Sequence, residues 1–176
     1  MITGYTGPAG AVAIPDTITG LPVTSIGDFA FNAIALTGVS LPASVTYIGT
    51  EAFAGTSLTN ITIPNRVTYI GQSAFSGCAG LAAVTLPDTV TNLGTGSFES
   101  CSSLVSVTIP GSIDYLGDAT FQGCTSLSAV AVSNGVTTVG IGTFSGCSAL
   151  TSITIPDTVT SILDESFFGP DRKSVV

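Results

Sequence analysis

The side chains best suited to chemistry are four cysteines and a few neighbouring carboxylates, because the chain contains no histidine. Without histidine, neither a Ser–His nor a Cys–His nucleophile can be assembled. Asp114 and Asp118 are close in sequence, as are Asp164 and Glu165, and glycoside hydrolysis uses paired carboxylates. We expect these acids to lie at solvated turns rather than in a shared cleft. The sequence therefore predicts that the protein is not an enzyme.

The elements that position these residues follow from a repeat along the whole chain. Phenylalanines recur every 22 or 23 residues, as Phe31, Phe53, Phe75, Phe98, Phe121, Phe144 and Phe167. Self-similarity at this period is the signature of a solenoid, in which each coil stacks on the one before. A single coil cannot bury its own apolar side. Stacking at ~4.8 Å per strand lets all the coils share one continuous core.

Each repeat is predicted to contain two short strands and a turn. In one copy, Leu104–Pro110 alternates apolar and polar side chains, which predicts a strand ended by proline. Ile113 and Leu116 predict a second, shorter strand. Gly117 then suits a turn that needs either positive φ or close backbone approach. The stretch from this glycine to the next phenylalanine is expected to form one turn of 3₁₀ or short helix.

The cysteines share one repeat position, at Cys78, Cys101, Cys124 and Cys147. They are therefore expected to form a ladder with steps of ~4.8 Å. Four ligands in a line do not surround a metal ion tetrahedrally. Neighbouring Cβ atoms that point the same way also suit the disulfide torsion poorly. We favour free thiols packed as small hydrophobic groups, with disulfides and a metal site as the alternatives.

The repeat L-x-x-V-x-I-P-x-x-V-x-x-I-G-x-x-A-F-x-G-C resembles the BspA-type leucine-rich repeat, found chiefly in bacterial surface proteins, over about residues 9–169. The resemblance implies a mainly β, right-handed leucine-rich-repeat solenoid of about seven 22–23-residue coils, with parallel β-sheets and short 3₁₀ or helical turns. It also implies cell-surface display or secretion, and adhesion or protein binding. Two departures stand out, an insertion at Thr19–Val23 and the loss of the repeat proline at Ser133.

Composition narrows the classes of partner. The chain has 3 basic and 11 acidic residues and a net charge of −8. That balance disfavours nucleic acid and anionic membranes, which need clustered Lys and Arg. No apolar run approaches the ~18 residues of a membrane-spanning helix, so we expect no membrane insertion by this segment. Nothing in the sequence predicts a cofactor or a metal ion.

Two rows of outward-facing positions are candidates for binding. The first strand carries a hydroxyl ladder, which is equally well explained by threonine's preference for exposed strand positions: Ser40, Thr62, Thr85, Thr108, Ala131 and Thr154. The second strand carries Tyr47, Tyr69, Asn92 and Tyr115 at one shared position, and Arg66 precedes Tyr69. We predict that these five residues form the binding surface, although strand tyrosines are also used as half-buried scaffold.

Two functions remain open at this point. The leading prediction is a non-catalytic extracellular binding or adhesion module that engages a protein or a glycan. The alternative is a structural stalk or spacer array in a larger bacterial cell-surface protein. A stalk repeats its exposed residues from coil to coil, whereas a binder diversifies them in one place. The variation at Asn92, Asp114 and Arg66 favours binding.

The chain ends carry an expectation of their own. We expect one solenoid domain over residues 1–170, a monomeric segment of a longer chain that lacks both end caps and contains no signal peptide. Residues 171–176 break the repeat and hold two of the three basic residues. Read as codons, GAT CGG AAG AGC GTC GTG would encode this stretch, and that string is part of a sequencing-adapter oligonucleotide. We therefore interpret it as a non-native tail, with a genuine polar C-terminal tail as the alternative.

Overall fold

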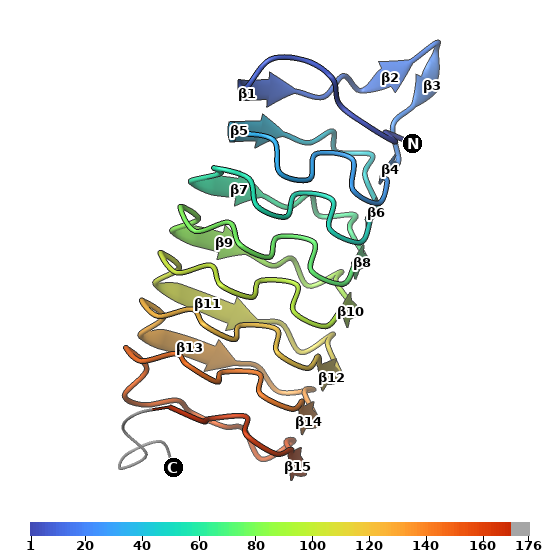
Figure 1. The fold of residues 1–176 in the computed structure, drawn as a ribbon. Coiled ribbons are helices and arrows are strands. Elements are labelled where there is room, and N and C mark those ends of the chain that lie inside the picture. Colours follow the sequence, from blue (N-terminus) through green and yellow to red (C-terminus); the bar gives the residue numbers. More distant parts are fainter. Residues whose placement is uncertain (170–176) are drawn as a thin grey trace.

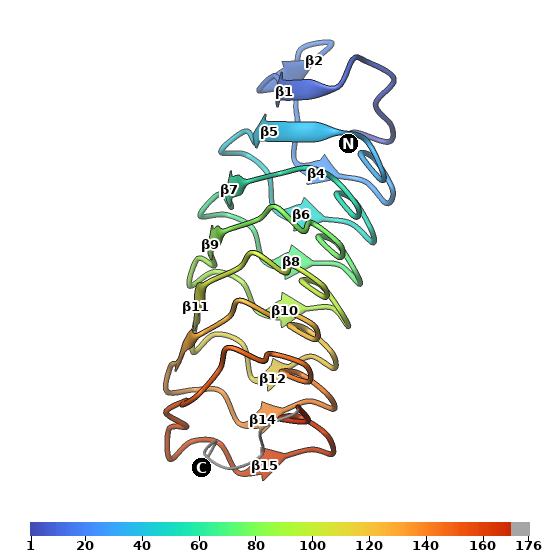
Figure 2. The same cartoon turned by 60° about the vertical axis from the view of Figure 1, so that its left-hand side comes forward.

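The structure, a computed structural model, describes residues 1–169, so the predicted tail at 171–176 lies outside the described residues. The chain winds into coils stacked along one axis, as predicted (Figures 1 and 2). The first strand of each coil belongs to one side of the stack: β1 (Gly10–Ala13), β5 (Leu36–Ser40), β7 (Asn60–Thr62), β9 (Ala83–Thr85), β11 (Ser106–Ile109) and β13 (Ala129–Val132). We call the outward side chains of this side the first face.

The second, shorter strand of each coil belongs to a separate side: β4 (Ser25–Ile26), β6 (Tyr47–Ile48), β8 (Tyr69–Ile70), β10 (Asn92–Leu93), β12 (Tyr115–Leu116), β14 (Thr138–Val139) and β15 (Ser161–Ile162). We call its outward side chains the second face. On both sides, strands pair in parallel with the equivalent strand of the next coil, except between β5 and β7 on the first side and between β10 and β12 on the second. On the second side, pairing runs from β4 to β10 and again from β12 to β15, in two separate sheets.

The core is a column of stacked phenylalanine rings. Successive centroids from Phe31 to Phe167 lie 5.2 to 5.7 Å apart, with ring planes within 15° of parallel. The rings from Phe31 to Phe144 are buried together with the repeat leucines, valines and isoleucines. Because every coil places the same side chain at the same height, the column fixes the register between coils. This arrangement confirms the register predicted from the sequence.

The repeated glycine is required by close backbone approach rather than by positive φ. A Cβ atom added to Gly71 would lie 2.6 Å from the carbonyl carbon of Gly49, and one added to Gly94 would lie 2.6 Å from that of Gly71. Neither glycine has a positive φ. The coils therefore touch backbone to backbone at this point, and no side chain fits between them.

The expected turn of 3₁₀ or short helix is wrong in detail, since no residue of 1–169 is helical. In the second full coil, Glu51 has a φ of 51° and Gly55 a φ of 66°, which interrupts any helical run. The N–H groups of Ala52 and Ala54 close turns within the coil, whereas those of Glu51, Phe53 and Gly55 donate to the next coil. Backbone N–H groups of alternate turn residues thus form a third ladder of hydrogen bonds between coils, in addition to the strand pairing on the two sides.

The two sequence departures have clear structural results. The insertion at Thr19–Val23 forms part of an antiparallel hairpin, β2 (Thr17–Ile18) and β3 (Leu21–Pro22), which projects from the first coil (Figure 1). Ser133 replaces proline and therefore has an N–H group, which donates to the carbonyl of Ile109 at 3.0 Å. Before the first coil, the ring of Tyr5 packs on Phe31 with centroids 5.3 Å apart.

Candidate functional site

The predicted tyrosine row lies on the second face, where parallel pairing aligns Tyr47, Tyr69 and Asn92 in adjacent coils. The rings of Tyr47 and Tyr69 stack with centroids 4.9 Å apart and an interplanar angle of 6°. Each ring is half-buried, whereas Asn92 is exposed. The stack is a rigid aromatic block that presents ring edges and hydroxyl groups to solvent, with its inner ring faces covered by each other.

Tyr115 continues the row on the far side of the sheet break. It is 45% exposed and so is the most accessible tyrosine of the row. Its hydroxyl donates to Oδ1 of Asp118, whose same oxygen also accepts from the N–H of Ile141. The hydrogen bond to Asp118 and, to a smaller extent, burial raise the pKa of Tyr115 to about 12. The ring is therefore held in place and its hydroxyl stays protonated at neutral pH.

A second carboxylate acts on the tyrosine stack. The pKa of Tyr47 is raised, first by partial desolvation and then by the negative charge of Asp28 in the preceding coil. Asp28 also accepts a hydrogen bond of 2.8 Å from the N–H of Thr50. Asp28 and Asp118 thus occupy the same repeat position, directly after the repeat glycine, and each accepts the backbone N–H of the following coil.

The structure does not bring Arg66 to the tyrosines. Buried Val67 stands between Arg66 and Tyr69 in the chain. Arg66 lines a hollow of about 490 Å³ together with Val39 and Leu41, and no tyrosine lines that hollow. Within residues 1–169 the guanidinium of Arg66 has no hydrogen bond or ion pair. Arg66 is therefore separate from the other four predicted residues.

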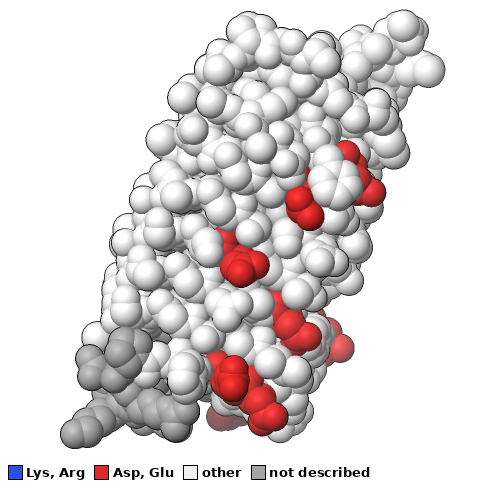
Figure 3. All heavy atoms as spheres, viewed as in Figure 1, with Lys and Arg blue, Asp and Glu red and all other residues white. Residues whose placement is uncertain are grey.

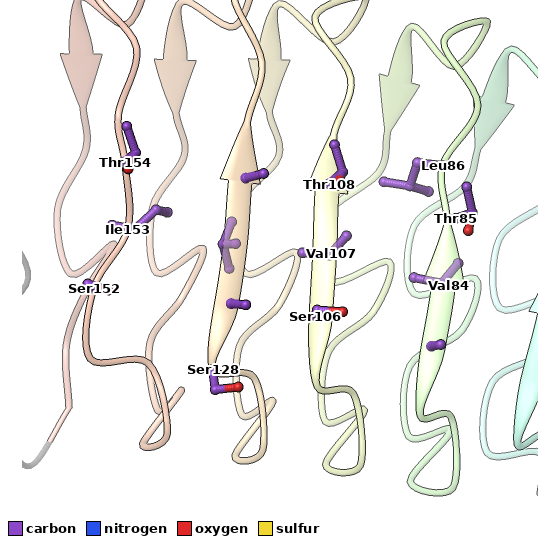
Figure 4. A pocket seen from close by; sticks show the side chains of 14 residues that line it. Val84, Thr85, Leu86, Ser106, Val107, Thr108, Ser128, Ser152, Ile153 and Thr154 are labelled. Carbon is purple, nitrogen blue, oxygen red and sulfur yellow. The ribbon is translucent and has the colours of Figure 1, made fainter.

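The first face carries a groove that the sequence did not predict. The groove has a volume of about 500 Å³ and lies over β9, β11, β13 and the Ser152–Thr154 segment that follows them. Figure 4 shows Thr85 and Thr108 on adjacent coils, and Thr154 two coils beyond Thr108, with the coil of Ala131 between them. The positions of the predicted hydroxyl ladder are exposed here, and the walls contain no charged residue. The row of small residues in the hydroxyl ladder could have indicated this groove, because no large side chain fills the space above the strands.

Charge is distributed unevenly between the faces. Acidic residues gather along the edge formed by the second strands and the turns after them, with no basic residue on the side shown in Figure 3. By sequence, the acids next to the second strands and in the turns after them are Asp28, Glu51, Glu99, Asp114, Asp118, Asp164 and Glu165. Several accept hydrogen bonds from their neighbours, as Glu51 does from Asn32 at 2.9 Å and Asp114 does from Thr137. They act first as structural acceptors, and the predicted carboxylate pairs do not share a cavity.

The cysteines form the predicted ladder inside the core. All four are buried free thiols, and each donates to a phenylalanine carbonyl in the preceding coil over 3.1 to 3.3 Å. Burial raises the pKa of all four thiols, to about 12 for Cys124 and Cys147. Thr56 takes the same position in an earlier coil and lies 3.2 Å from Cys78. Thiols held in this protonated, buried form are packing groups.

Residues 1–169 contain no cluster of three or more Cys, Asp or Glu side chains arranged to hold a metal ion. The same residues contain no helix long and apolar enough to span a bilayer.

The stacked parallel coils define a β-solenoid of the leucine-rich-repeat class. The family model of the BspA type leucine rich repeat region matches this chain in 6 copies, at residues 12–63 and 46–172. The chain belongs to this family, as the sequence resemblance indicated.

Solved structures of similar proteins come from several bacteria. The leucine-rich repeat protein TpLRR of T. pallidum is 31% identical with a TM-score of 0.71, over 89% of this chain and 82% of that one. A leucine-rich repeat protein of Eubacterium ventriosum is 27% identical with a TM-score of 0.74, over 94% of this chain and 45% of that one. A leucine-rich cell surface protein of Faecalibacterium prausnitzii is 31% identical with a TM-score of 0.56, over 92% and 51%.

This chain therefore spans about half or less of the last two proteins. No curated protein matches it.

Proposed function

We propose that this chain is a non-catalytic extracellular binding module that engages a protein or glycan partner through the second face. The proposed surface consists of Tyr47, Tyr69, Asn92 and Tyr115. The observation that carries the proposal is the stacked pair of Tyr47 and Tyr69, held in a rigid row on an outward face. Tyrosine supplies a large amphipathic contact at a low cost in conformational entropy, which is why it is frequent at recognition surfaces.

Pre-organisation supports this assignment. The parallel ladder fixes the backbone of each tyrosine, and stacking or the bond to Asp118 fixes its ring. A partner therefore binds without first having to order these side chains. The second face is also the side on which residue types change from coil to coil, from Ser25 through the tyrosines and Asn92 to Thr138 and Ser161.

The non-catalytic part of the proposal rests on chemistry. The sequence has no histidine, and the thiols are buried with raised pKa values. The carboxylates of Asp114 and Asp118 accept hydrogen bonds from Thr137 and Tyr115 rather than facing each other across a cleft. Neither of these two carboxylates, nor any of the four thiols, is thus poised beside a second group to transfer a proton to a common substrate.

Surface location is part of the same proposal. The F. prausnitzii relative is described as a leucine-rich cell surface protein, and the family match extends over nearly the whole chain. We infer cell-surface display or secretion, with this chain as a monomeric segment of a longer protein. The acidic edge disfavours nucleic acid as the partner.

The structural stalk is the second candidate, and one observation favours it. Outward positions of the first face repeat the same small residues, as Thr62, Thr85 and Thr108 illustrate. A spacer array needs such a uniform, inert surface and no more. The two candidates differ in what they predict for the second face.

The test is adhesion of beads coated with the full chain to immobilised extracellular-matrix proteins and mucin glycans. We expect adhesion to at least one of these, and loss of about tenfold or more when Tyr47, Tyr69 and Tyr115 are all replaced by serine. Thermal unfolding of the variant checks that the fold persists. Unchanged adhesion of a folded variant favours the stalk, and collapse of the fold shows that the tyrosines are scaffold.

A further inference from the structure

Arg66 departs from a hydrogen-bonding pattern that three other coils share at its repeat position, although Gly135 has no hydroxyl there and Thr158 accepts from the N–H of Gly135 instead. The second residue after the repeat proline is Ser44, Thr89 or Ser112 in other coils. Each of these hydroxyls donates to a carbonyl of the preceding coil, to Val23 at 2.7 Å, Val67 at 2.8 Å and Val90 at 2.6 Å. In these three coils the hydroxyl therefore links one coil to the preceding one, and we call this hydrogen bond the latch.

Arg66 gives up this latch and forms no replacement for it. Its guanidinium has no hydrogen bond or ion pair within residues 1–169, although the described chain is strongly acidic. It is also the single Lys or Arg among residues 1–169, because the other two are Arg172 and Lys173. A local rule broken without a structural gain points to a functional role.

The surroundings of Arg66 form a hollow with an apolar floor. The hollow has a volume of about 490 Å³, and its floor contains Val39, Leu41 and Ile63. Val39 and Leu41 are half-buried, so their apolar surface is still accessible to a ligand. The volume falls within the ~300–1,000 Å³ that is usual for ligand sites in proteins.

The rim of the hollow is polar. Ser40, Thr62 and Asn65 line it and are exposed, and their side chains have no hydrogen bond within residues 1–169. Free hydroxyl and amide groups of this kind suit backbone N–H and C=O groups of a peptide. A fatty acid has no groups that would use them, and an open hollow leaves most of a long alkyl chain in water.

The equivalent hollow one coil further provides an internal contrast. It has a volume of about 460 Å³ and is lined by Leu86, Pro87 and Thr89, with Asp88 where Asn65 stands in the Arg66 coil. Its Thr89 retains the latch to Val67. The shape of the corner is thus repeated, and only the Arg66 coil pairs the hollow with a free cation.

We propose that the hollow beside Arg66 binds the C-terminal end of a partner polypeptide whose last side chain is apolar. The guanidinium holds the terminal carboxylate through charge-assisted hydrogen bonds, to which the planar arginine fork is well suited. The last side chain covers Val39, Leu41 and Ile63. This site is distinct from the tyrosine row, and it does not depend on the function proposed for that row.

The test uses methyl NMR of the full chain, with signals of Val39, Leu41 and Ile63 as reporters. The probes are acetyl-Ser-Thr-Ala-Val-Leu with a free carboxylate and the same peptide as its carboxamide. We expect the acid to shift these three signals and to bind about tenfold more tightly than the amide, as befits a hydrogen bond to a charged group. Equal affinity of acid and amide would overturn the proposal.

Variants separate the site from the scaffold. Arg66→Thr installs the residue used in the neighbouring coil, so we expect the fold to be kept and the preference for the acid to be lost. Ser112→Thr, at the same repeat position, should leave that preference intact, as should the triple tyrosine variant. An Arg66→Thr protein that still prefers the acid contradicts the proposal, as does octanoate binding more tightly than the peptide acid.

Discussion

The two faces of the solenoid share one core and one repeat, yet they differ in chemistry. On the first face, outward positions such as Thr85, Ser106 and Thr108 are small, uncharged and nearly uniform. On the second face, the equivalent positions hold stacked tyrosines beside carboxylates. Since both faces are built from parallel strands at the same spacing, the fold does not impose this difference. The outward residues of the second face have therefore diversified, whereas those of the first face have stayed small and uniform except in the coil of Arg66.

The largest effect is expected from a change in the column of stacked phenylalanine rings, which lies beneath both faces. Phe98→Ala deletes a fully buried ring between Phe75 and Phe121 and should cost ~3–5 kcal/mol of unfolding free energy. Urea unfolding followed by circular dichroism measures this loss. An unchanged unfolding midpoint would mean that the stacked rings do not hold the coils in register. The two faces could then not be compared as two surfaces built on one shared core.

The next largest loss of stability is expected from a substitution that disturbs the second side more than the first. Gly94→Ala places a Cβ atom 2.6 Å from the carbonyl carbon of Gly71, so the backbones of these coils must separate beside β8 and β10. Overpacking of this kind typically costs ~1–3 kcal/mol. Gly80→Ala is the matched control, since its Cβ meets nothing nearer than 3.3 Å. Hydrogen exchange should rise at Tyr69 and Asn92 in Gly94→Ala, and equal exchange in both variants would refute the close-approach role.

Alkaline pH tests the thiol ladder beneath both faces. Burial raises the pKa of Cys124 and Cys147 to about 12 from an ordinary value of 9.0. The unfolded chain therefore releases these protons first as pH rises, so it binds fewer protons than the folded chain and stability falls from about pH 9 towards pH 12. Urea midpoints at several pH values measure the fall.

Cys124→Thr with Cys147→Thr provides the control for that experiment, because Thr56 fills the same position in another coil. The double variant should lose less stability between neutral and alkaline pH than the parent. Non-reducing mass analysis should find four free and slowly reacting thiols in the folded parent. Two intact disulfide bridges would show that the ladder is wrong.

The smallest expected effect concerns one hydrogen bond on the second face. Tyr115→Phe removes the hydroxyl that donates to Asp118, and since the pair is exposed, we expect a loss of only ~0.5–1 kcal/mol. The same change should leave the ring and the adhesion of the second face largely intact. A loss of several kcal/mol would mean that Tyr115 is scaffold rather than part of a binding surface.

The buried half of the structure was predictable because a packed core tolerates few residue types. Phe98, Leu104 and Cys124 each recur at fixed intervals, and each is buried where the repeat placed it. The turn was not predictable as readily. A helical turn and the observed alternating turn differ mainly in the sign of φ at Glu51, a residue type that does not signal positive φ. Gly96 and Gly142 at the equivalent position were the available hint.

The candidate site was predictable only in part, because exposed residues are not constrained by packing. Shared repeat positions correctly aligned Tyr47 with Tyr69 and Asn92. Proximity in sequence suggested that Arg66 would join Tyr69, but Arg66 lines a hollow with Val39 and Leu41, and Tyr69 does not line it. The hollow beside Arg66 depends on the partial exposure of Val39 and Leu41, and partial exposure is set by packing that the repeat pattern does not describe.

Adhesion of two matched triple variants, measured side by side, tests the central claim most directly. One replaces Tyr47, Tyr69 and Tyr115 by serine, and the other replaces Thr85, Thr108 and Thr154 of the first face by alanine. With both proteins folded, the account predicts that the tyrosine variant loses adhesion to matrix proteins or mucin glycans while the threonine variant retains it. Retention by the tyrosine variant together with loss by the threonine variant would contradict the account and move the binding surface to the first face.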